Sequence, residues 1–513
     1  MPDVLTAARM RAIEQEEIVS GRVSGLALME RAGAGVVAAI LRHWPELGTG
    51  NRSAVVLCGP GNNGGDGFVI ARLLQARGWE VTTCLLGTPD GMGPDARANH
   101  DRWLETGTVT GLTQDMTIPD GACPDVVVDA LFGTGLCRPV TGPVCKVIAR
   151  VQDLRRRLGV RCVAVDIPSG ICADSGKALG CHMQADLTVS FHRAKIGHHL
   201  GIGGGHSVQL DVCDIGLPAG AHGKGQVRLV RTADPAFLSK TAAGQKYVHG
   251  HALVLSGGPG RTGAARLAAR SALRIGAGLV TLGVPPAAQF EVAAHVTALM
   301  QVRIADADGL SNLLQDARLN ALCLGPALGT GPQSRALIEA ALASQRPLVL
   351  DADALTLFRA QPDDLFRMLH NQVVLTPHGG EFQRLFPDIA RQLAEPARRG
   401  PAYSKVDATR AAAARAGCTV LFKGAATVIA TADGKCAIHS AQYDRAAPWL
   451  ATAGAGDVLA GFITGLLARG AEPMAACEMA VWLHVQCALD FGPGLIAEDI
   501  PEQLPGVLRG LGV

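Results

Sequence analysis

Short runs of apolar residues alternate with longer stretches of helical periodicity along the chain. In the first half, strands are predicted at 53–58, 80–86, 125–129, 161–166 and 187–191, and helices at 6–18, 26–43, 67–77 and 144–156. The strand segments are apolar throughout, which is typical of parallel strands covered by helices on both faces. In such sheets, ligands bind at the carboxyl ends of the strands.

The same alternation restarts in the second half. Strands are predicted at 252–256, 279–282, 321–324, 347–350, 372–375, 419–422 and 427–430, and helices at 263–275, 408–416 and 457–469. Between the halves, residues 216–245 are polar and rich in Gly, Pro and Ala, which indicates a linker. The pattern predicts an α/β protein with two domains, residues 1–222 and 223–513, each a mostly parallel sheet covered by helices on both faces.

Composition and charge narrow the range of functions. Hydrophobic residues make up 48% of the 513 residues but aromatic residues only 4%, so the cores consist mainly of aliphatic side chains. The net charge is +2 and no basic run stands out, which argues against nucleic acid or an anionic membrane as a partner. Residues 1–11 lack an apolar signal core. No uncharged apolar stretch reaches the roughly 18 residues needed to span a membrane.

The 14 cysteines include no CxxC pair and are scattered among apolar strands and loops. We interpret them as reduced, packed thiols. The sequence therefore predicts a cytoplasmic protein.

A glycine-rich segment, GNNGGDG at 61–67, follows the first buried strand and precedes a predicted helix. Glycine lets the backbone approach a ligand closely, and the amino end of a helix favours an anion. A tight turn between strand and helix is the plainer interpretation of such a segment. Asn62, Asn63 and Asp66 lie within it, and so many polar side chains favour a functional site.

Two further predicted strands end in a carboxylate, at VDALFGTG (128–135) and VDIPSG (165–170). Either Asp129 or Asp166 alone could cap a turn. Together with Asn63 and Ser169, however, they predict an oxygen-rich pocket at neighbouring strand ends. Hard oxygen ligands suit a cation such as K⁺ or Mg²⁺, and one carboxylate could act as a general base.

In the second half, LATAGAGDVLAG (450–461) places Asp457 in the first turn of a helix behind a glycine turn. Backbone N–H groups at such a turn can hold a phosphoryl group during transfer. Asp457 would then take the proton from the attacking hydroxyl. The plainer role is compensation of the helix dipole, which contributes about 0.3–1 kcal/mol.

Polar motifs follow other predicted strands of the second half. Two carboxylates lie in LVLDADAL (348–355), His378 and Glu381 lie in TPHGGEF (376–382), and Lys423 lies in LFKGAATVIA (421–430). Glycine turns also occur at 257–265 and 324–329. Caps, a structural histidine and a surface lysine are the plainer interpretations. Together, the motifs predict a nucleotide-phosphate site around Asp457.

The motifs of the first half, in this order, resemble the epimerase domain of the NAD(P)H-hydrate repair proteins over residues 5–215. FHRAKIG (191–197) resembles the next segment of that family more loosely. The resemblance implies a Rossmann-like domain with Asp166 as a catalytic residue and K⁺ held by Asn63, Asp129 and Ser169. It implies that the hydrated cofactor contacts Asn62, Asn63, Gly64, Gly65, Asp66, Gly133, Thr134, Gly135, Leu136, Cys137, Arg138, Pro139 and Asp166.

The motifs of the second half resemble the ADP-dependent NAD(P)H-hydrate dehydratases of the ribokinase-like superfamily over residues 245–505. The resemblance implies catalysis by Asp457 and Mg²⁺ on the phosphates of ADP. It implies ADP contacts from Lys423, Gly424, Ala425, Ala426, Thr427 and Gly456, and hydrate contacts from Ala265, Gly329, His378 and Asp457. Gly379 departs from the usual Pro of the family, and Gln245-Lys246-Tyr247 departs from its usual His-Lys-Gly.

The resemblance implies an enzyme that epimerises R- and S-NAD(P)HX and dehydrates the S form with ADP, giving NAD(P)H, AMP and phosphate. NADHX or NADPHX and ADP are the expected small-molecule partners, and a homo-oligomer is expected. Two alternatives remain open at this point. The second half could be a kinase for a small alcohol, because phosphoryl transfer comes first in both reactions. The first half could be a nucleotide-binding module without catalysis.

Overall fold

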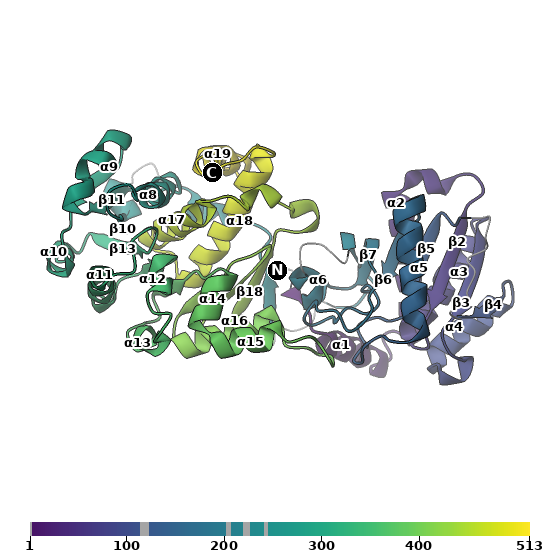
Figure 1. Cartoon of the computed structure of the whole chain (residues 1–513). Helices are drawn as coiled ribbons and strands as arrows, with labels where there is room; N and C mark the ends of the chain where they lie inside the picture. Colours follow the sequence, from purple (N-terminus) through teal and green to yellow (C-terminus); the bar gives the residue numbers. More distant parts are fainter. Residues whose placement is uncertain (1–2, 113–122, 202–206, 219–225, 241–244) are drawn as a thin grey trace. The chain divides into compact units, whose positions relative to one another are not determined.

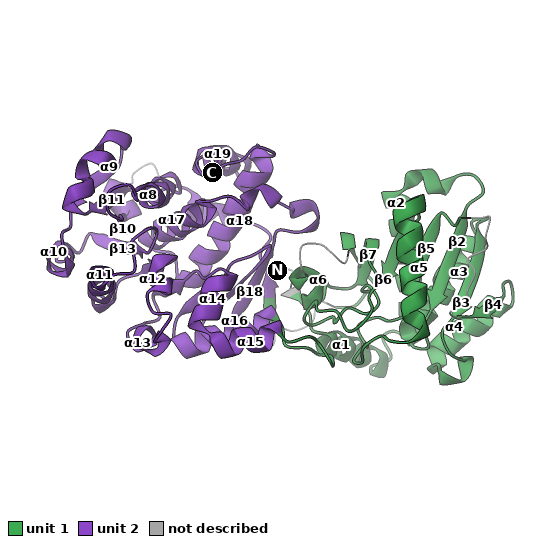
Figure 2. Cartoon of the chain, viewed as in Figure 1, with its two compact units in different colours: residues 1–227, 395–404 green, residues 228–394, 405–513 purple. Residues whose placement is uncertain are grey.

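In both halves of the chain, the uninterrupted apolar segments form β-sheets. The computed structural model describes residues 3–112, 123–201, 207–218, 226–240 and 245–513. The chain divides into two units (Figures 1 and 2), one of residues 1–227 and 395–404 and one of residues 228–394 and 405–513. The predicted boundary between residues 222 and 223 lies outside the described residues.

The strands of the first sheet are all parallel, and their order places β2 beside β5. From edge to edge they are β4 (Val109–Gly111), β3 (Glu80–Leu85), β2 (Ser53–Cys58), β5 (Val126–Ala130), β6 (Arg161–Val165), β7 (Ala185–Phe191) and β8 (Ser207–Cys213). The chain runs from β2 to β3 on one side and returns to β5 on the other. Such a reversal of strand order opens a crevice at the carboxyl ends of the strands.

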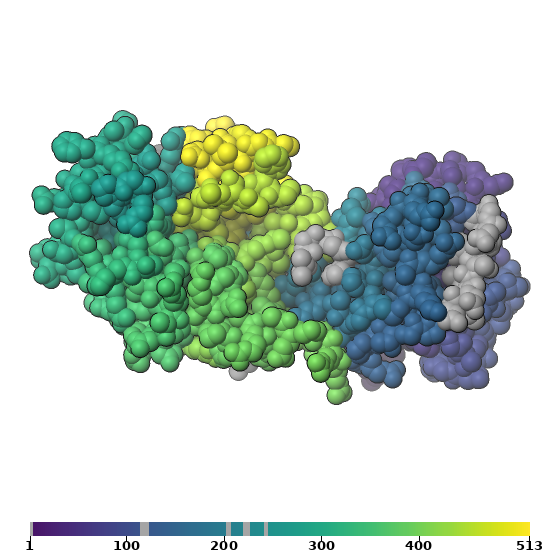
Figure 3. All heavy atoms as spheres, viewed as in Figure 1, coloured from purple at the N-terminus to yellow at the C-terminus, as the bar shows by residue number. Residues whose placement is uncertain are grey.

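Helices cover both faces of this sheet. Along β2, Ala54, Val56 and Cys58 lie in the apolar cluster shared with α2 (Gly25–His43) and α3 (Asn62–Gln75). Val55 and Leu57 lie in the cluster shared with α5 (Pro143–Leu158) on the opposite face. Figure 3 shows α5, in blue, on the outer surface of this unit. The three layers agree with the predicted α/β class.

Helix α3 begins at Asn62, five residues before the predicted start, so the glycine-rich segment forms its first turn. A Cβ atom on Gly64 would come within 1.9 Å of the carbonyl oxygen of Gly59. A Cβ atom on Gly59 would come within 1.8 Å of the carbonyl oxygen of Leu131, after β5. The glycines therefore allow the helix and the loop after β5 to approach the end of β2.

The sheet of the second unit is parallel except at one side. Its strands include, in order, β18 (Cys436–Ser440), β17 (Ala426–Ala430), β16 (Thr419–Phe422), β15 (Val373–Leu375), β14 (Leu348–Leu350), β13 (Leu319–Leu324), β10 (His251–Leu255), β11 (Leu279–Val284) and β12 (Met300–Arg303). The pairs β16–β17 and β17–β18 are antiparallel. This mostly parallel sheet confirms the predicted fold class.

Helices also cover both faces of the second sheet (Figure 1). One apolar cluster joins a face of the sheet to α8 (Gly263–Arg274), α17 (Ala455–Ala468), α18 (Pro473–Phe491) and α19 (Asp499–Gly510). On the other face, Phe382 of α14 (Gly379–Leu385) stacks on Phe422 of β16, with ring centroids 4.1 Å apart. The remaining helices near this face include α11 (Pro332–Ala343), α15 (Pro387–Ala394) and α16 (Lys405–Ala416).

Helix α17 packs closely on α8 through glycine. A Cβ atom on Gly461 would come within 2.2 Å of the carbonyl oxygen of Ala268, and one on Gly465 within 2.6 Å of the carbonyl oxygen of Ala272. This contact fixes the amino end of α17, where Asp457 lies.

The segment 395–404 joins α15 to α16 but belongs to the first unit (Figure 2). There, the N–H of Gly400 donates to the carbonyl oxygen of Cys137 at 3.1 Å. The Nζ of Lys177 donates to the carbonyl oxygen of Glu395 at 3.0 Å. This segment therefore covers part of the loop after β5.

Two cysteines differ from the expectation of reduced thiols, because Cys145 and Cys181 form a disulfide. Cys145 lies in α5 and Cys181 in the loop 170–183, and the fold brings the two together although their positions in the sequence differ by 36. The other 12 cysteines are free in the described structure. Among the described helices, none combines the length and the apolar character required to cross a membrane.

Candidate active sites

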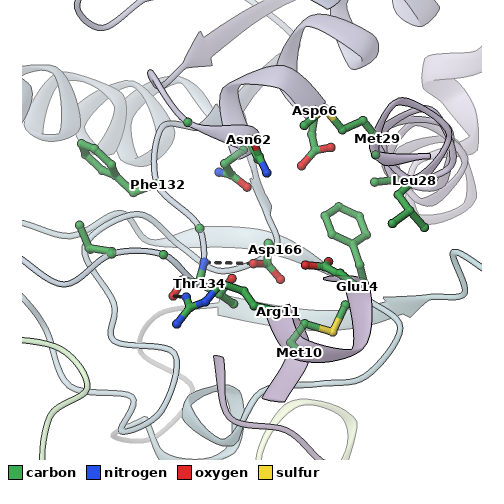
Figure 4. A pocket seen from close by; sticks show the side chains of 18 of the residues that line it. Met10, Arg11, Glu14, Leu28, Met29, Asn62, Asp66, Phe132, Thr134 and Asp166 are labelled. Atoms are coloured by element: carbon green, nitrogen blue, oxygen red, sulfur yellow. Dashed lines mark hydrogen bonds between the residues drawn. The ribbon is translucent and has the colours of Figure 1, made fainter. Parts of the chain in front are cut away.

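A cavity of about 510 Å³ opens at the carboxyl ends of β2, β5 and β6 in the first unit (Figure 4). Ten of the residues predicted to bind the hydrate line it: Asn62, Asn63, Asp66, Gly133, Thr134, Gly135, Leu136, Cys137, Arg138 and Asp166. Gly64 and Gly65 instead pack against Gly59 and against Met29 and Ala96, and Pro139 is exposed. The topology thus brings three distant motifs to one cavity.

Asp166 lies at the centre of a buried ion pair. The Nζ of Lys195 donates to Oδ1 of Asp166 at 2.8 Å, to Oγ of Ser190 at 2.9 Å and to the carbonyl oxygen of Phe191 at 3.2 Å. The N–H of Thr134 donates to Oδ2 at 3.1 Å. Burial opposes ionisation of Asp166, but the charge and hydrogen bond of Lys195 outweigh it and lower the pKa of the carboxyl. Asp166 is therefore an anion with a fixed orientation.

His198, in α6 (Ile196–Leu200), holds the backbone of this pair. The N–H of Lys195 donates to Nδ1 of His198 at 2.9 Å, so Nε2 carries the proton and donates to the carbonyl oxygen of Asp166 at 2.9 Å. Burial, with the nearby charge of Lys195, lowers the pKa of His198 to about 4. The neutral ring stabilises Asp166 in its left-handed conformation, with φ of 67°.

Two more carboxyl groups face the cavity, on Asp66 of α3 and Glu14 of α1 (Ala7–Val19). Burial, followed by the charges of Asp166 and Glu14, raises the pKa of Asp66 well above its usual value. Burial also raises the pKa of Glu14, and the charge of Asp166 adds to that effect. The cavity therefore combines one carboxylate whose pKa is lowered with two carboxyl groups whose pKa is raised.

The predicted cation ligands lie beside this cavity. Asp129 is fully buried, and its Oδ1 and Oδ2 accept hydrogen bonds from Oγ and N–H of Ser169 at 2.6 and 2.8 Å. Burial raises the pKa of Asp129 to about 6, although these hydrogen bonds oppose the rise. Within the described structure, the buried Nδ2 of Asn63 has no hydrogen-bond partner. The side chains of Asn63, Asp129 and Ser169 carry oxygen atoms with a single carboxylate among them, which is a donor set that K⁺ can use.

In the second unit, side chains that follow three adjacent strands meet near the amino end of α17. The Nζ of Lys423, after β16, lies 2.7 Å from Oδ1 of Asp351, after β14, and 3.9 Å from Oε2 of Glu381, after β15. Burial, and then the charge of Asp351, raises the pKa of Asp457 to about 6, while Lys423 acts in the opposite direction. Asp457 is half-buried and has the properties of a general base.

Lys405 of α16 donates hydrogen bonds to the backbone of the predicted nucleotide segment, Lys423 to Thr427. The Nζ of Lys405 donates to the carbonyl oxygens of Lys423 at 3.0 Å and Ala426 at 2.6 Å. It also lies 4.1 Å from the ring centroid of Phe422. Burial lowers the pKa of Lys405 to about 7. Gly456, at the start of α17, lies against the Nζ of Lys423.

The predicted hydrate ligands of this unit lie at different depths. His378 caps α14: its Nδ1 accepts from the N–H of Gly380 at 3.0 Å, and its side chain is 55% exposed. The N–H of Gly329 donates to Oδ2 of Asp353 at 2.8 Å. Ala265 is fully buried between α8 and the core. His378 is therefore the most accessible of these three residues.

Metal ligation by the protein alone is not indicated near Asp457. The described residues contain no cluster of three or more His, Cys, Asp or Glu side chains that could hold a metal ion. Mg²⁺ commonly binds substrate phosphates with only one or two carboxylates. Asp351 and Asp353, in the turn after β14, fit that mode of binding.

Comparison with known proteins decides the family. Residues 25–197 match the family described as YjeF-related protein N-terminus, and residues 252–499 match the family described as NAD(P)H-hydrate dehydratase. A bifunctional NAD(P)H-hydrate repair enzyme Nnr of Moorella thermoacetica is 35% identical, over 99% of this chain and 97% of its own. The chain belongs to the bifunctional NAD(P)H-hydrate repair family.

Relatives of this repair-family chain include single-domain proteins. An NAD(P)H-hydrate epimerase of Rhodobacter capsulatus is 49% identical over 39% of this chain and 92% of its own. A solved Bacillus subtilis structure, named as an ADP/ATP-dependent NAD(P)H-hydrate dehydratase, is 28% identical over 53% of this chain and 93% of its own, with a TM-score of 0.43.

Four charged residues of the two sites in this repair-family chain were not predicted from the sequence: Arg11, Glu14, Lys195 and Lys405. Arg11 and Glu14 lie three residues apart on α1, beside buried Met10 and Ile13, so helical periodicity alone could have placed them at the edge of the core. Lys195 lies in the segment noted for its looser resemblance. No local sequence pattern marks Lys405 as a site residue, because only the fold brings its ammonium group to the backbone of Lys423.

Proposed function

We propose that the chain repairs hydrated nicotinamide cofactors through two activities. The first domain, residues 1–222, epimerises R- and S-NAD(P)HX. The second domain, residues 223–513, dehydrates S-NAD(P)HX at the expense of ADP. The observation that carries the proposal is a half-buried Asp457 with a raised pKa at a helix amino end beside Lys423, in a chain that also contains the Asp166 cavity. Family membership supports both assignments.

In the second domain, Asp457 takes the proton of the C6 hydroxyl of the hydrate. The hydroxyl oxygen attacks the terminal phosphorus of ADP, and the bond from that phosphorus to AMP breaks. Phosphate then leaves C6 with its bonding electrons, helped by the lone pair of N1. Loss of a proton from C5 gives NAD(P)H. Mg²⁺ neutralises phosphate charge in such reactions.

The residues assigned to each ligand follow from this scheme. Lys423, with the backbone of Gly424, Ala425, Ala426 and Thr427 and with Gly456, binds ADP, and its ammonium group stabilises the transferring phosphoryl group. Gly329, His378 and Asp457 contact the hydrate, whereas Ala265 has no exposed surface with which to reach it. His378 is oriented by its cap contacts with α14, which suits a residue that positions a substrate.

In the first domain, Asp166 acts on the hydrate within the cavity. The residues of segments 62–66 and 133–139 that line the cavity bind the hydrate around it. K⁺ binds to Asn63, Asp129 and Ser169, and its charge compensates the buried carboxylate of Asp129. We also infer a cytoplasmic location, which the 12 free cysteines support. A homo-oligomer is part of the same proposal.

The experiment uses a mixture of R and S hydrates of NADH with ADP, Mg²⁺ and K⁺, and follows the near-ultraviolet absorbance of NADH. Full recovery of NADH is the expected result. Recovery that stops when the S epimer is consumed would assign only the dehydratase. A stable phosphorylated product without NADH would instead indicate the small-alcohol kinase. Hydrate binding to the first domain without epimerisation would indicate a non-catalytic module.

A further inference from the structure

Epimerisation at C6 by loss and return of water needs proton transfer on both faces of the ring, and one fixed carboxylate cannot supply both. We propose that Asp66 and Glu14 are the two proton carriers of the epimerase site, one for each face of the hydrate, and that Asp166 remains ionised as a fixed negative charge beside the reacting ring. This inference rests on the epimerase function proposed above. Glu14 belongs to none of the motifs that identify the family.

The two proposed proton carriers lie on different helices of the cavity wall. Asp66 projects from α3 and Glu14 from α1, which are separate walls of the cavity. Figure 4 shows the carboxyl group of Asp66 on one side of the hollow, with Glu14 and Asp166 on the other side and all three directed inward. A ring bound between α3 and α1 would present one face to each carrier.

The hydrogen bonds of the two proposed carriers differ from those of Asp166. In the described part of the chain, neither the carboxyl group of Asp66 nor that of Glu14 takes part in an ion pair or a side-chain hydrogen bond. Asp166 differs, because Lys195, Ser190 and Thr134 all donate to it. A carboxyl group without a protein partner can exchange a proton with a substrate, whereas Asp166 is held in one charge state.

The negative charges near Asp66 affect its ionisation. The pKa of Asp66 is raised by burial and then by the charges of Asp166 and Glu14. Two carboxyl groups that lie close enough to interact can share one proton. A protonated acid and an ionised base then coexist in one site, as general acid–base catalysis requires. The other charged residues of the cavity wall are Arg11, Asp95, Arg138, Asp166 and Lys195.

The chemical step balances in protons and electrons. One carrier donates its proton to the C6 hydroxyl, the C6–O bond breaks, and water leaves with the bonding electrons. The lone pair of N1 forms a C6=N1 iminium, whose positive charge the Asp166 carboxylate stabilises. Water adds to the other face of C6, and the second carrier accepts the released proton. The reverse reaction uses the two carriers in exchanged roles.

The experiment measures inversion and oxygen exchange together, in water labelled with heavy oxygen (¹⁸O). The intact protein should incorporate one labelled oxygen at C6 for each inversion, after subtraction of the uncatalysed rate. Inversion without incorporation would indicate ring opening at N1 and would overturn the proposal. Absence of any catalysed inversion would instead reject the epimerase function itself, so the two failures are distinguishable.

The variants are Glu14→Gln and Asp66→Asn, with Glu16→Gln, an exposed position of the same helix, as the control. Each of the first two should slow inversion by about 10²–10⁴-fold, and the control should not. Hydrate binding by calorimetry and thermal unfolding show whether each variant is folded. Oxygen exchange should fall less than inversion for one epimer, because the remaining carrier still expels and returns water on its own face.

Two results would contradict the assignment of one carrier to each face. The first is inversion at the wild-type rate in either variant. The second is an equal fall of exchange and inversion in folded variants that still bind the hydrate, because a structural role of these residues would have that effect.

Discussion

The ammonium group of Lys195 lies 2.8 Å from a carboxylate oxygen of Asp166, and the two side chains are 1% and 11% exposed. This pair lies in the wall of the first cavity, where burial raises the pKa of the carboxyl groups of Asp66 and Glu14. An ion pair so deeply buried is costly to disrupt, because the partner that remains is an unpaired charge in a medium of low polarity. The pair therefore contributes to both the fold and the proposed chemistry.

Replacement of Lys195 by Met should lower the free energy of unfolding by about 3–5 kcal/mol and abolish epimerisation, since burial would then raise the pKa of Asp166. Denaturant unfolding and the epimerase assay measure the two effects. The double variant Lys195→Met with Asp166→Asn should recover much of the stability but none of the activity. Wild-type stability in the single variant would contradict this account.

The same pair predicts how stability depends on pH. The folded-state pKa of Asp166 is lowered, so the stabilisation from its ionised form is present above the unfolded-state value of about 4. It is lost as the pH falls through the lower pKa of the folded state. Unfolding free energies measured across the acid range should show this loss in the wild type. The double variant should lack that part of the profile.

Dehydration should depend on the ionisation of Asp457. Because burial raises the pKa of Asp457 to about 6, kcat/KM should increase as the pH rises through about 6 and then level off. Asp457→Asn should reduce dehydration by about 10²–10⁴-fold and leave epimerisation unchanged. Asp444→Asn, at an exposed position outside the site, is the control. An unchanged acid limb in the Asp457→Asn variant would assign the ionisation to another group.

Lys405→Met should weaken ADP binding. The substitution leaves the carbonyl oxygens of Lys423 and Ala426 without their donor, at a cost of about 1–3 kcal/mol, part of which affects the bound loop. Calorimetric titration with ADP measures the change. Lys435→Met, at an exposed position between β17 and β18, should leave affinity unchanged. Equal ADP affinity in the Lys405→Met variant would show that this support is dispensable.

Gly461→Ala should destabilise the second unit by about 1–3 kcal/mol, because the added methyl group collides with the backbone of α8. The matched substitution Gly506→Ala, in α19, meets nothing closer than 3.9 Å. It should stabilise the protein by up to about 1 kcal/mol, since Ala favours a helix. Denaturant unfolding compares the two. A stabilising Gly461→Ala would show that α17 can move away from α8.

K⁺ should raise the midpoint of thermal unfolding, because an ion that binds only the folded chain stabilises it. Asp129→Asn should remove this dependence, and tetramethylammonium should not replace K⁺. The measurement is a comparison of thermal unfolding in the two chloride salts. Equal midpoints in both salts for the wild type would reject the cation site at Asn63, Asp129 and Ser169.

Local sequence pattern predicted much of the fold, because buried parallel strands such as 53–58 are continuous apolar runs. It failed where tertiary contacts override local preference. The amino end of α3 is rich in glycine, which disfavours a helix. Glycine is nevertheless required at position 64, because Gly59 and Gly64 approach too closely for a side chain. Edge strands such as β4 and β12 are short and partly exposed, so they lack the same signal.

The candidate sites show the same limit. Asp457 was recognisable because it follows Gly456 at the start of a helix, and Asp166 because it ends a buried apolar strand ahead of the turn that contains Gly170. Glu14 and Lys405 belong to ordinary helical segments, and only the packing of those helices brings them to a site. The disulfide of Cys145 and Cys181 likewise depends on spatial proximity across 36 residues, which spacing alone does not encode.

The segment 395–404 comes from the second half of the sequence but packs in the first unit. A fragment that ends at residue 227 would lack the N–H of Gly400 that caps Cys137, in the loop bordering the proposed epimerase cavity. A fragment that begins at residue 228 would carry that segment with nothing to cover. Each fragment would thus lose contacts that the segment makes in the intact chain, so a cut between the two units does not separate every contact of one from the other.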